Sequence, residues 1–259
     1  MISLVCTGRV VLAEPQLVLF DKDGTLIDIH HYWASMIRLR ALHLREILFP
    51  ARADNETVQA HIERAMGIDH ASGRMRPEGP VGVKPRPFNV AVTRNALLDF
   101  GLEVSADCIE SLFAEVDTAT GDDLLPLLRL LPGVSVLLEV LEQNGIAMGI
   151  VSSDITTRAE KAMAALGLSR YFRFVIGGDA VSRSKPAPDL VETALGKGVY
   201  RREDTVVIGD HPVDIQMGCA AGVGASIGVL TGLSDEQAFA GLDCVVASDL
   251  TFLSIAEGN

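Results

Sequence analysis

The residues best suited to chemistry stand in short groups, each directly after an apolar run. The first group is Asp21-Lys22-Asp23-Gly24-Thr25, which follows Leu17–Phe20. Two carboxylates two positions apart can have different roles in one reaction. Asp21 can attack phosphorus as a nucleophile, while Asp23 can protonate a leaving oxygen and later activate water. Gly24 permits a tight turn that a side chain would obstruct. The alternative, a turn whose Asp residues cap a helix, is less compatible with the full pattern.

Ser152 and Ser153 follow a second apolar run, Ile146–Val151. A hydroxyl and backbone N–H groups at a strand-to-helix turn can bind phosphate oxygens. Ser153 or Asp154 could instead cap the helix, which leaves Ser152 as the better phosphate ligand.

Lys185 lies in the third group, Ser184-Lys185-Pro186-Ala187-Pro188-Asp189. The prolines restrict the local backbone. A fixed ammonium could neutralise both a nucleophile and a transferring phosphoryl group, although a lone lysine is more often only solvated.

The fourth group, Gly209 to Asp214, places two acids four positions apart after Val206–Ile208. Carboxylates suit Mg²⁺, which prefers oxygen ligands. We expect Asp210 to bind the ion directly and Asp214, on the next helical turn, to orient a water or Lys185. Helix capping and a solvated acid are the structural alternative.

The apolar patterns around these groups predict a parallel α/β core that positions them. The apolar runs named above, together with Phe174–Ile176, fit strands buried on both faces. Strands and helices alternate from Pro132 onwards, which implies βα units whose carboxyl ends meet at one edge. The helical stripes between them are Val134/Leu137/Leu138/Leu141, Ala159/Ala162/Met163/Leu166 and Leu190/Val191/Ala194/Leu195.

Residues 29–131 differ from the core, because their patterns are helical without a clear strand. We therefore predict a catalytic core of residues 1–28 and 132–259 with a helical unit, 29–131, inserted into it. Residues 1–14 fit either an added strand or a disordered lead. The predicted helices of the insert are Trp33–Leu48, Thr57–Met66, Asn89–Phe100 and Ala106–Val116, with a Gly/Pro-rich loop at Gly67–Pro87.

The four groups, in this order, resemble the motifs of the haloacid dehalogenase-like superfamily over residues 17–28 and 132–230. The resemblance implies a Rossmann-like parallel sheet. The insert resembles a helical C1 cap, as in phosphoglycolate phosphatases and β-phosphoglucomutases.

The same resemblance implies Mg²⁺ as cofactor, held by Asp21, the backbone carbonyl of Asp23, and Asp210, with Asp214 beside them. It implies an aspartyl-phosphate on Asp21, with Asp23 and Lys185 as further catalytic residues. Ser152, Ser153, Gly24 and Lys185 are then the expected phosphate-binding residues.

Substrate specificity is expected to come from the insert. A hinge is expected near Ile27–Ile29. The candidates lie just after it or in the long loop, and they are His30, His31, Trp33, Arg74, Arg76 and Arg86. For these residues, packing within the cap or simple solvation is the alternative.

Net charge, the length of apolar runs and cysteine spacing limit the kinds of partner and site that we expect. A net charge of −12 over 259 residues disfavours nucleic acid and anionic membranes. No apolar run approaches the ~18 residues needed to span a bilayer, and the four scattered cysteines form no CxxC pair. We expect a cytoplasmic monomer or homodimer acting on a small phosphorylated metabolite.

Several other activities were weighed against hydrolysis of a phosphate ester. Dehalogenases usually lack the second acid, so Asp23 favours phosphate, and Lys84 is an unpromising Schiff-base lysine for a phosphonoacetaldehyde hydrolase. A signalling receiver would lack the large insert. A phosphomutase and a catalytically silent binding protein stay open as alternatives.

Overall fold

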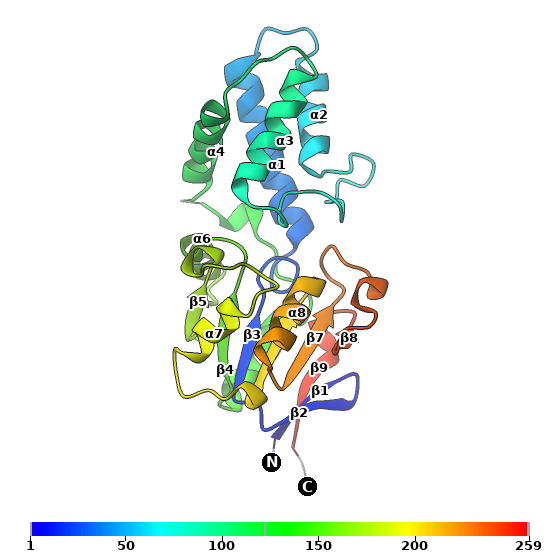
Figure 1. Ribbon diagram of the computed structural model, residues 1–259, viewed down its shortest axis with the longest axis vertical. Coiled ribbons are helices and arrows are strands. Elements are labelled where there is room, and N and C mark those ends of the chain that lie inside the picture. Colours follow the sequence, from blue (N-terminus) through cyan, green and yellow to red (C-terminus); the bar gives the residue numbers. More distant parts are fainter. Residues whose placement is uncertain (1, 122, 258–259) are drawn as a thin grey trace. The chain divides into compact units, whose positions relative to one another are not determined.

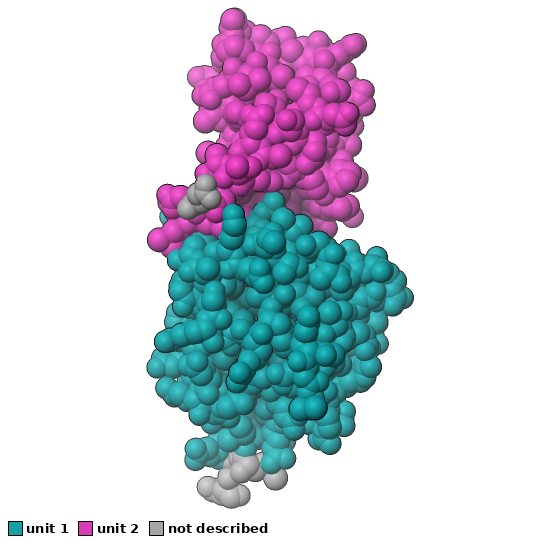
Figure 2. Space-filling view, turned by 90° about the vertical axis from the view of Figure 1, so that its left-hand side faces the viewer, with its two compact units in different colours: residues 1–28, 128–259 teal, residues 29–127 magenta. Residues whose placement is uncertain are grey.

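The computed structural model describes residues 2–121 and 123–257, and the chain divides into two compact units. Unit 1 comprises residues 1–28 and 128–259, and unit 2 comprises residues 29–127; Figure 2 distinguishes them by colour. Of the described residues, none lies in a helix long and apolar enough to cross a membrane.

Unit 1 contains a six-stranded parallel sheet in the order β5-β4-β3-β6-β7-β8 (Figure 1). This confirms the predicted α/β fold class. The strands are β3 (Leu17–Phe20), β4 (Ala147–Val151), β5 (Phe174–Ile176), β6 (Thr205–Gly209), β7 (Ala225–Val229) and β8 (Val245–Ala247); the helices are α5 (Val134–Gln143), α6 (Thr156–Ala165), α7 (Asp189–Leu195) and α8 (Pro212–Ala221).

The central strand β3 is wholly buried, as its continuous apolar run predicts. Leu17 and Leu19 pack into one cluster with apolar residues of α7 and α8. Since side chains alternate along a strand, the equally buried Val18 and Phe20 face the opposite side of the sheet. Burial on both faces fixes β3 at the centre of the sheet, so that the residue after Phe20 stands at the sheet edge where ligands collect.

Residues near the N-terminus form strands rather than a disordered lead. In unit 1, β1 (Ile2–Cys6) pairs antiparallel with both β2 (Arg9–Ala13) and β9 (Leu253–Glu257) in a second, three-stranded sheet. The sequence left the state of residues 1–14 open because the partner strand β9 lies at the other end of the chain.

The chain returns to unit 1 at Leu128, earlier than the predicted Pro132. The reason is local pairing: Leu130 bridges Ile27, and the N–H of Asp28 donates to the carbonyl of Arg129 over 2.8 Å. The outgoing and returning segments therefore run beside each other before the first residue of unit 2.

Unit 2 is helical, and the pattern located its helices to within a few residues. The helix α1 begins at Ile29 rather than at Trp33, so His30 and His31 belong to its first turn. Pro87 was assigned to the loop, but it lies in the first turn of α3, where its missing N–H needs no partner. The helices are α1 (Ile29–Leu48), α2 (Asn55–Met66), α3 (Arg86–Leu98) and α4 (Ala106–Gly121).

Candidate active site

Asp21 stands directly after β3, where the chain leaves the sheet in a tight loop. Its N–H donates to the carbonyl of Ile208 on β6, over 2.9 Å. The loop then turns back, because the N–H of Gly24 donates to the carbonyl of Ile27 over 2.7 Å. Gly24 has a φ of +95°, and a Cβ at this position would overlap the carboxylate of Asp210. Glycine is thus required both for the turn and for the close approach of a neighbouring acid.

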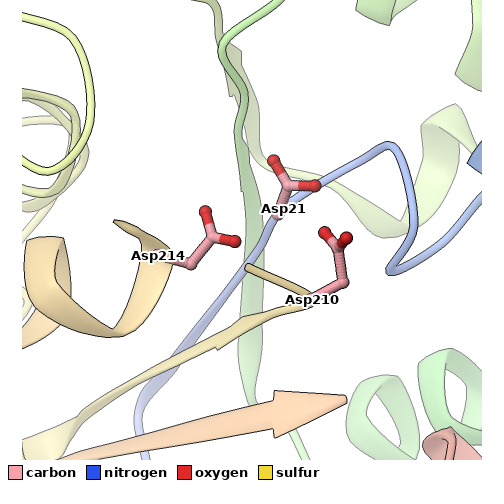
Figure 3. A group of neighbouring side chains, drawn as sticks. All are labelled: Asp21, Asp210 and Asp214. Atoms are coloured by element: carbon pink, nitrogen blue, oxygen red, sulfur yellow. The ribbon is translucent and has the colours of Figure 1, made fainter. Parts of the chain in front are cut away.

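Asp210 and Asp214 enter the same place from β6 and α8. Asp210 is the first residue after β6, and Asp214 lies in the first turn of α8. The backbone N–H of His211 donates to Oδ2 of Asp214 over 3.1 Å, which fixes that carboxylate at the helix start. Figure 3 shows the side chains of Asp21, Asp210 and Asp214 converging.

Lys185 ties two of these acids together. Its Nζ lies 2.6 Å from Oδ1 of Asp21 and 2.6 Å from Oδ1 of Asp214, and its side chain is only 2% exposed. Lys185, which was expected to place a fixed ammonium beside Asp21, therefore contacts that residue and also Asp214, the acid expected to orient it.

We call Asp21, Asp210 and Asp214 the acidic cluster; one oxygen of each lies within 4.8 Å of the others. All three side chains are buried. Three carboxylates beside the single ammonium of Lys185 leave two negative charges without a cation in this group.

This imbalance perturbs the protonation of the cluster. Burial, followed by the charges of Asp21 and Asp214, holds the pKa of Asp210 well above its ordinary value. Burial also raises the pKa of Asp21, against the opposing effect of Lys185. Burial disfavours the charged lysine, but the carboxylates of Asp21 and Asp214 hold the pKa of Lys185 above its usual range. Buried oxygen donors with excess negative charge are the donor set that a hard divalent cation requires.

The carboxylate of Asp23 points to a different partner. Its Oδ1 lies 2.7 Å from Nζ of Lys22, and the lysine side chain is completely buried. Burial raises the pKa of Asp23, and Lys22 opposes that rise. The carboxylate of Asp23 is thus paired with Lys22 and does not belong to the acidic cluster.

Ser152 is buried at the end of β4, whereas Ser153 is exposed. The N–H of Asp154 donates to Oγ of Ser152 over 3.1 Å. The expectation that Ser153 or Asp154 caps the following helix is wrong, because Ile155 occupies the cap position and provides no side-chain cap. The oxygens of Asp154 instead accept from the N–H of Ile155 and from Arg158.

Sequence reasoning missed a loop that closes the site from β7. The hydroxyl of Thr231 donates to the carbonyl of Gly24 over 2.5 Å. A Cβ at Gly232 would overlap Asp210, and the N–H of Leu233 donates to Oδ2 of Asp210 over 3.4 Å. The signal was present, since a polar residue and a glycine follow an apolar strand run, Ala225–Val229, as in the other groups.

Two of the specificity candidates on α1 make hydrogen bonds inside unit 2. Nδ1 of His30 accepts from the N–H of Met75 over 3.2 Å, and Nε2 of His31 lies 3.1 Å from the carbonyl of Pro126. Trp33 is buried, with its ring edge-on to Tyr32. These contacts agree with packing inside unit 2, the alternative to a role in substrate specificity.

The loop arginines also differ from one another. Arg86 pairs with Glu110 and Asp117, and Arg76 donates to the carbonyl of Arg64 over 2.5 Å. Arg74 is exposed. Among the three candidates, Arg74 is therefore the best placed to meet a solute, and the other two contribute to the structure of unit 2.

Comparison with known proteins agrees with this geometry. Residues 15–222 match the family model described as haloacid dehalogenase-like hydrolase. A phosphoglycolate phosphatase from Rhodobacter capsulatus is 27% identical over 80% of each chain. A validoxylamine A 7'-phosphate phosphatase from Streptomyces hygroscopicus subsp. limoneus is 26% identical over 91% of this chain and 94% of its own.

Among solved structures, a candidate β-phosphoglucomutase from Thermotoga maritima superposes with a TM-score of 0.65. It shares 21% identity over 92% of this chain and 96% of its own. At this identity the likeness shows a common fold.

Proposed function

This chain belongs to the haloacid dehalogenase-like hydrolases, and we propose that it is a Mg²⁺-dependent phosphatase that acts on a small phosphorylated metabolite through an aspartyl-phosphate on Asp21. The observation that carries the proposal is the contact between Asp21 and the buried ammonium of Lys185, over 2.6 Å, within the acidic cluster.

The acidic cluster fits the proposed cofactor. Asp21 and Asp210 would hold Mg²⁺ together with the backbone carbonyl of Asp23, and Asp214 would hold Lys185 or a water of the ion. When bound, the ion would offset the excess negative charge and polarise a phosphate oxygen. The raised pKa values of Asp21 and Asp210 support this assignment, because a nearby cation lowers the cost of ionising both carboxyls.

The protein's own groups divide the reaction into two displacements. A carboxylate oxygen of Asp21 attacks phosphorus while the bond to the leaving alcohol breaks, and the carboxyl of Asp23 gives its proton to that alcohol. The carboxylate of Asp23 then takes a proton from water as the water attacks the phosphorus of the aspartyl-phosphate. Asp21 is restored and inorganic phosphate leaves.

Lys185 and Ser152 would position the transferring group. The ammonium of Lys185 already lies against Asp21, so it needs no rearrangement to neutralise charge that develops there. The buried hydroxyl of Ser152, at the end of the strand beside β3, would donate to a phosphate oxygen. Most of the acceleration would then come from positioning and charge stabilisation.

The relatives suggest the class of substrate. One is named for phosphoglycolate and another for validoxylamine A 7'-phosphate. We therefore propose a phosphoglycolate-like acid or a sugar phosphate as substrate. The enzyme would act on this free metabolite in the cytoplasm, as a monomer or homodimer.

Phosphomutase activity is the second candidate, favoured by the structural likeness to a candidate β-phosphoglucomutase. The chemistry on Asp21 would be the same, and only the acceptor of the phosphoryl group would differ. Conversion of a sugar phosphate to its isomer without free phosphate would identify it.

The test is phosphate release from a panel of phosphorylated acids and sugars, with Mg²⁺ and with EDTA, for the wild type and Asp21→Asn. We expect metal-dependent release that disappears in the variant. Release that persists in Asp21→Asn would contradict the covalent mechanism, and release unaffected by EDTA would contradict the metal.

A further inference from the structure

Lys22 is a charged residue in an unusual place. Its side chain is completely inaccessible to solvent, although it lies between the two acids of the first motif. Its ammonium is 2.7 Å from Oδ1 of Asp23 and 3.2 Å from Oδ2 of Asp154. It therefore joins the loop after β3 to the loop after β4.

The second anchor, Asp154, is itself held firmly. Its Oδ1 accepts from Arg158 over 2.8 Å and from the N–H of Ile155 over 2.8 Å. Its carbonyl accepts from the N–H of Gly178 over 2.8 Å. Arg158 lies one helical turn after Asp154, so the carboxylate that faces Lys22 is fixed from the side of α6.

Burying an ammonium between carboxylates costs free energy that an apolar side chain of similar length would avoid. The loop does not need a charge for its own shape, since the carbonyl of Lys22 accepts from the N–H groups of Leu26 and Ile27. The charge instead provides a hydrogen-bond donor that orients the carboxyl of Asp23. Asp154 holds the same ammonium from the other side.

We infer that Lys22, braced by Asp154, is a positioning residue that holds the side chain of Asp23 in the orientation for proton transfer to the leaving group. This inference rests on the proposed phosphatase function. It assigns Lys22 no contact with the phosphoryl group and no role in holding the metal.

Comparing two leaving groups of different basicity can test whether Lys22 acts through the proton transfer by Asp23. An alkyl alcohol is a strongly basic leaving group and needs a proton as its bond to phosphorus breaks. p-Nitrophenolate is weakly basic and can depart without one. Displacing Asp23 should therefore slow the first displacement for an alkyl phosphate and spare it for p-nitrophenyl phosphate. The value of kcat/KM isolates this step, because it covers only events up to the first irreversible one.

The experiment measures kcat/KM for both esters with wild type, Lys22→Met, Lys22→Arg and Asp154→Asn. Lys161→Met, on the exposed face of α6, is the matched control. We expect Lys22→Met to lower kcat/KM about 10²-fold for the best alkyl phosphate, in the range of general acid catalysis. The value for p-nitrophenyl phosphate should change by less than about threefold.

Asp154→Asn should also lower kcat/KM for the alkyl phosphate more than for p-nitrophenyl phosphate, but by a smaller factor. Lys22→Arg should keep part of the activity on the alkyl phosphate that Lys22→Met loses. The KM for the alkyl ester should stay close to that of the wild type, since substrate contacts are unchanged. Asp154→Asn keeps the size of the side chain, so it carries the test if Lys22→Met does not fold.

Equal losses for the two esters in the Lys22 and Asp154 variants would overturn the inference and assign the buried pair to structure alone. No loss for either ester would overturn it as well. Both results leave the phosphatase proposal intact, whereas a wild type inactive on every ester would refute that proposal and this inference with it.

Discussion

Both units contain groups of ion-paired side chains, but the charges balance in unit 2 and do not balance in unit 1. The acidic cluster of unit 1 sets three carboxylates against Lys185. In unit 2, a group that we call the unit-2 ion network sets two guanidiniums against two carboxylates: Arg40 and Arg86 contact Asp117, and Arg86 also contacts Glu110.

The surroundings reinforce this difference. The guanidiniums of Arg40 and Arg86 lie 5.0 and 5.1 Å from the centre of the Phe113 ring, so an aromatic face also receives the positive charge. In the acidic cluster, by contrast, burial raises the pKa values of Asp21 and Asp210. Perturbed pKa values cluster at functional sites, so we expect the acidic cluster to serve binding and catalysis and the balanced network to serve the fold of unit 2.

The largest effect is expected from Lys185→Met, which removes the cation of the acidic cluster. Activity should fall about 10³-fold, because the variant loses charge stabilisation at the reacting group. Without metal, unfolding should become easier by about 3 kcal/mol, as buried acids lose their partner. Steady-state assays and urea unfolding in EDTA measure the two effects.

The matched control is Lys197→Met, since Lys197 is exposed. Saturating Mg²⁺ should restore part of the stability of Lys185→Met without restoring activity. If Lys185→Met is as stable as the wild type in EDTA, the buried acids do not need this lysine to offset their charge. The cluster would then not carry excess negative charge.

The second effect concerns the unit-2 ion network. Asp117→Ala removes the carboxylate that both guanidiniums contact, and Arg40 has only 2% of its side chain exposed. We expect the free energy of unfolding to fall by about 3 kcal/mol, with activity per folded molecule retained. Glu115→Ala, which loses an exposed pair with His43, is the control. A selective loss of activity in Asp117→Ala would show that the network serves the substrate rather than the fold.

The difference between the two clusters also explains what sequence could and could not predict. Asp21 and Asp210 were identified because each directly follows an apolar strand, a local signal that parallel topology converts into proximity. Lys185 was less certain from its neighbours alone, and its assignment depended on the order of all four motifs.

Long-range pairings were beyond the same reasoning. Arg86 was placed in a solvated or substrate-binding loop, whereas it belongs to the first turn of α3 and its partners lie on α4. The buried pair of Lys22 and Asp154 links two strand ends that are distant in sequence. No periodicity or spacing encodes such partners, because they are set by how the elements pack.

A smaller effect is expected from Asp210→Asn in the metal-free protein. The pKa of Asp210 is raised in the folded state, so the folded protein keeps a proton that the unfolded chain releases. Its contribution to stability is complete below the unfolded pKa of about 3.9 and is lost as pH rises through the folded value. The variant lacks this loss, so near neutral pH it should be more stable than the wild type.

Urea unfolding in EDTA at several pH values measures this prediction. Adding Mg²⁺ should stabilise the wild type more than the variant, because the ion binds the folded state through the missing carboxylate. A variant less stable than the wild type at neutral pH in EDTA would indicate that Asp210 contributes to the fold, as the acids of unit 2 do.

The smallest effect is expected at the exposed edge of the unit-2 ion network. The Glu110 side chain is 48% exposed, and its partner Arg86 keeps Asp117 when Glu110 is removed. Glu110→Ala should therefore cost less than about 0.5 kcal/mol, since exposed ion pairs are screened and solvated. Its cost should also shrink as salt is added, whereas the cost of Asp117→Ala should not. If Glu110→Ala destabilised unit 2 as much as Asp117→Ala does, the network would act as one cooperative unit. Its stability would then not reside in the buried contact between Arg40 and Asp117, and charge balance alone would no longer separate it from the acidic cluster.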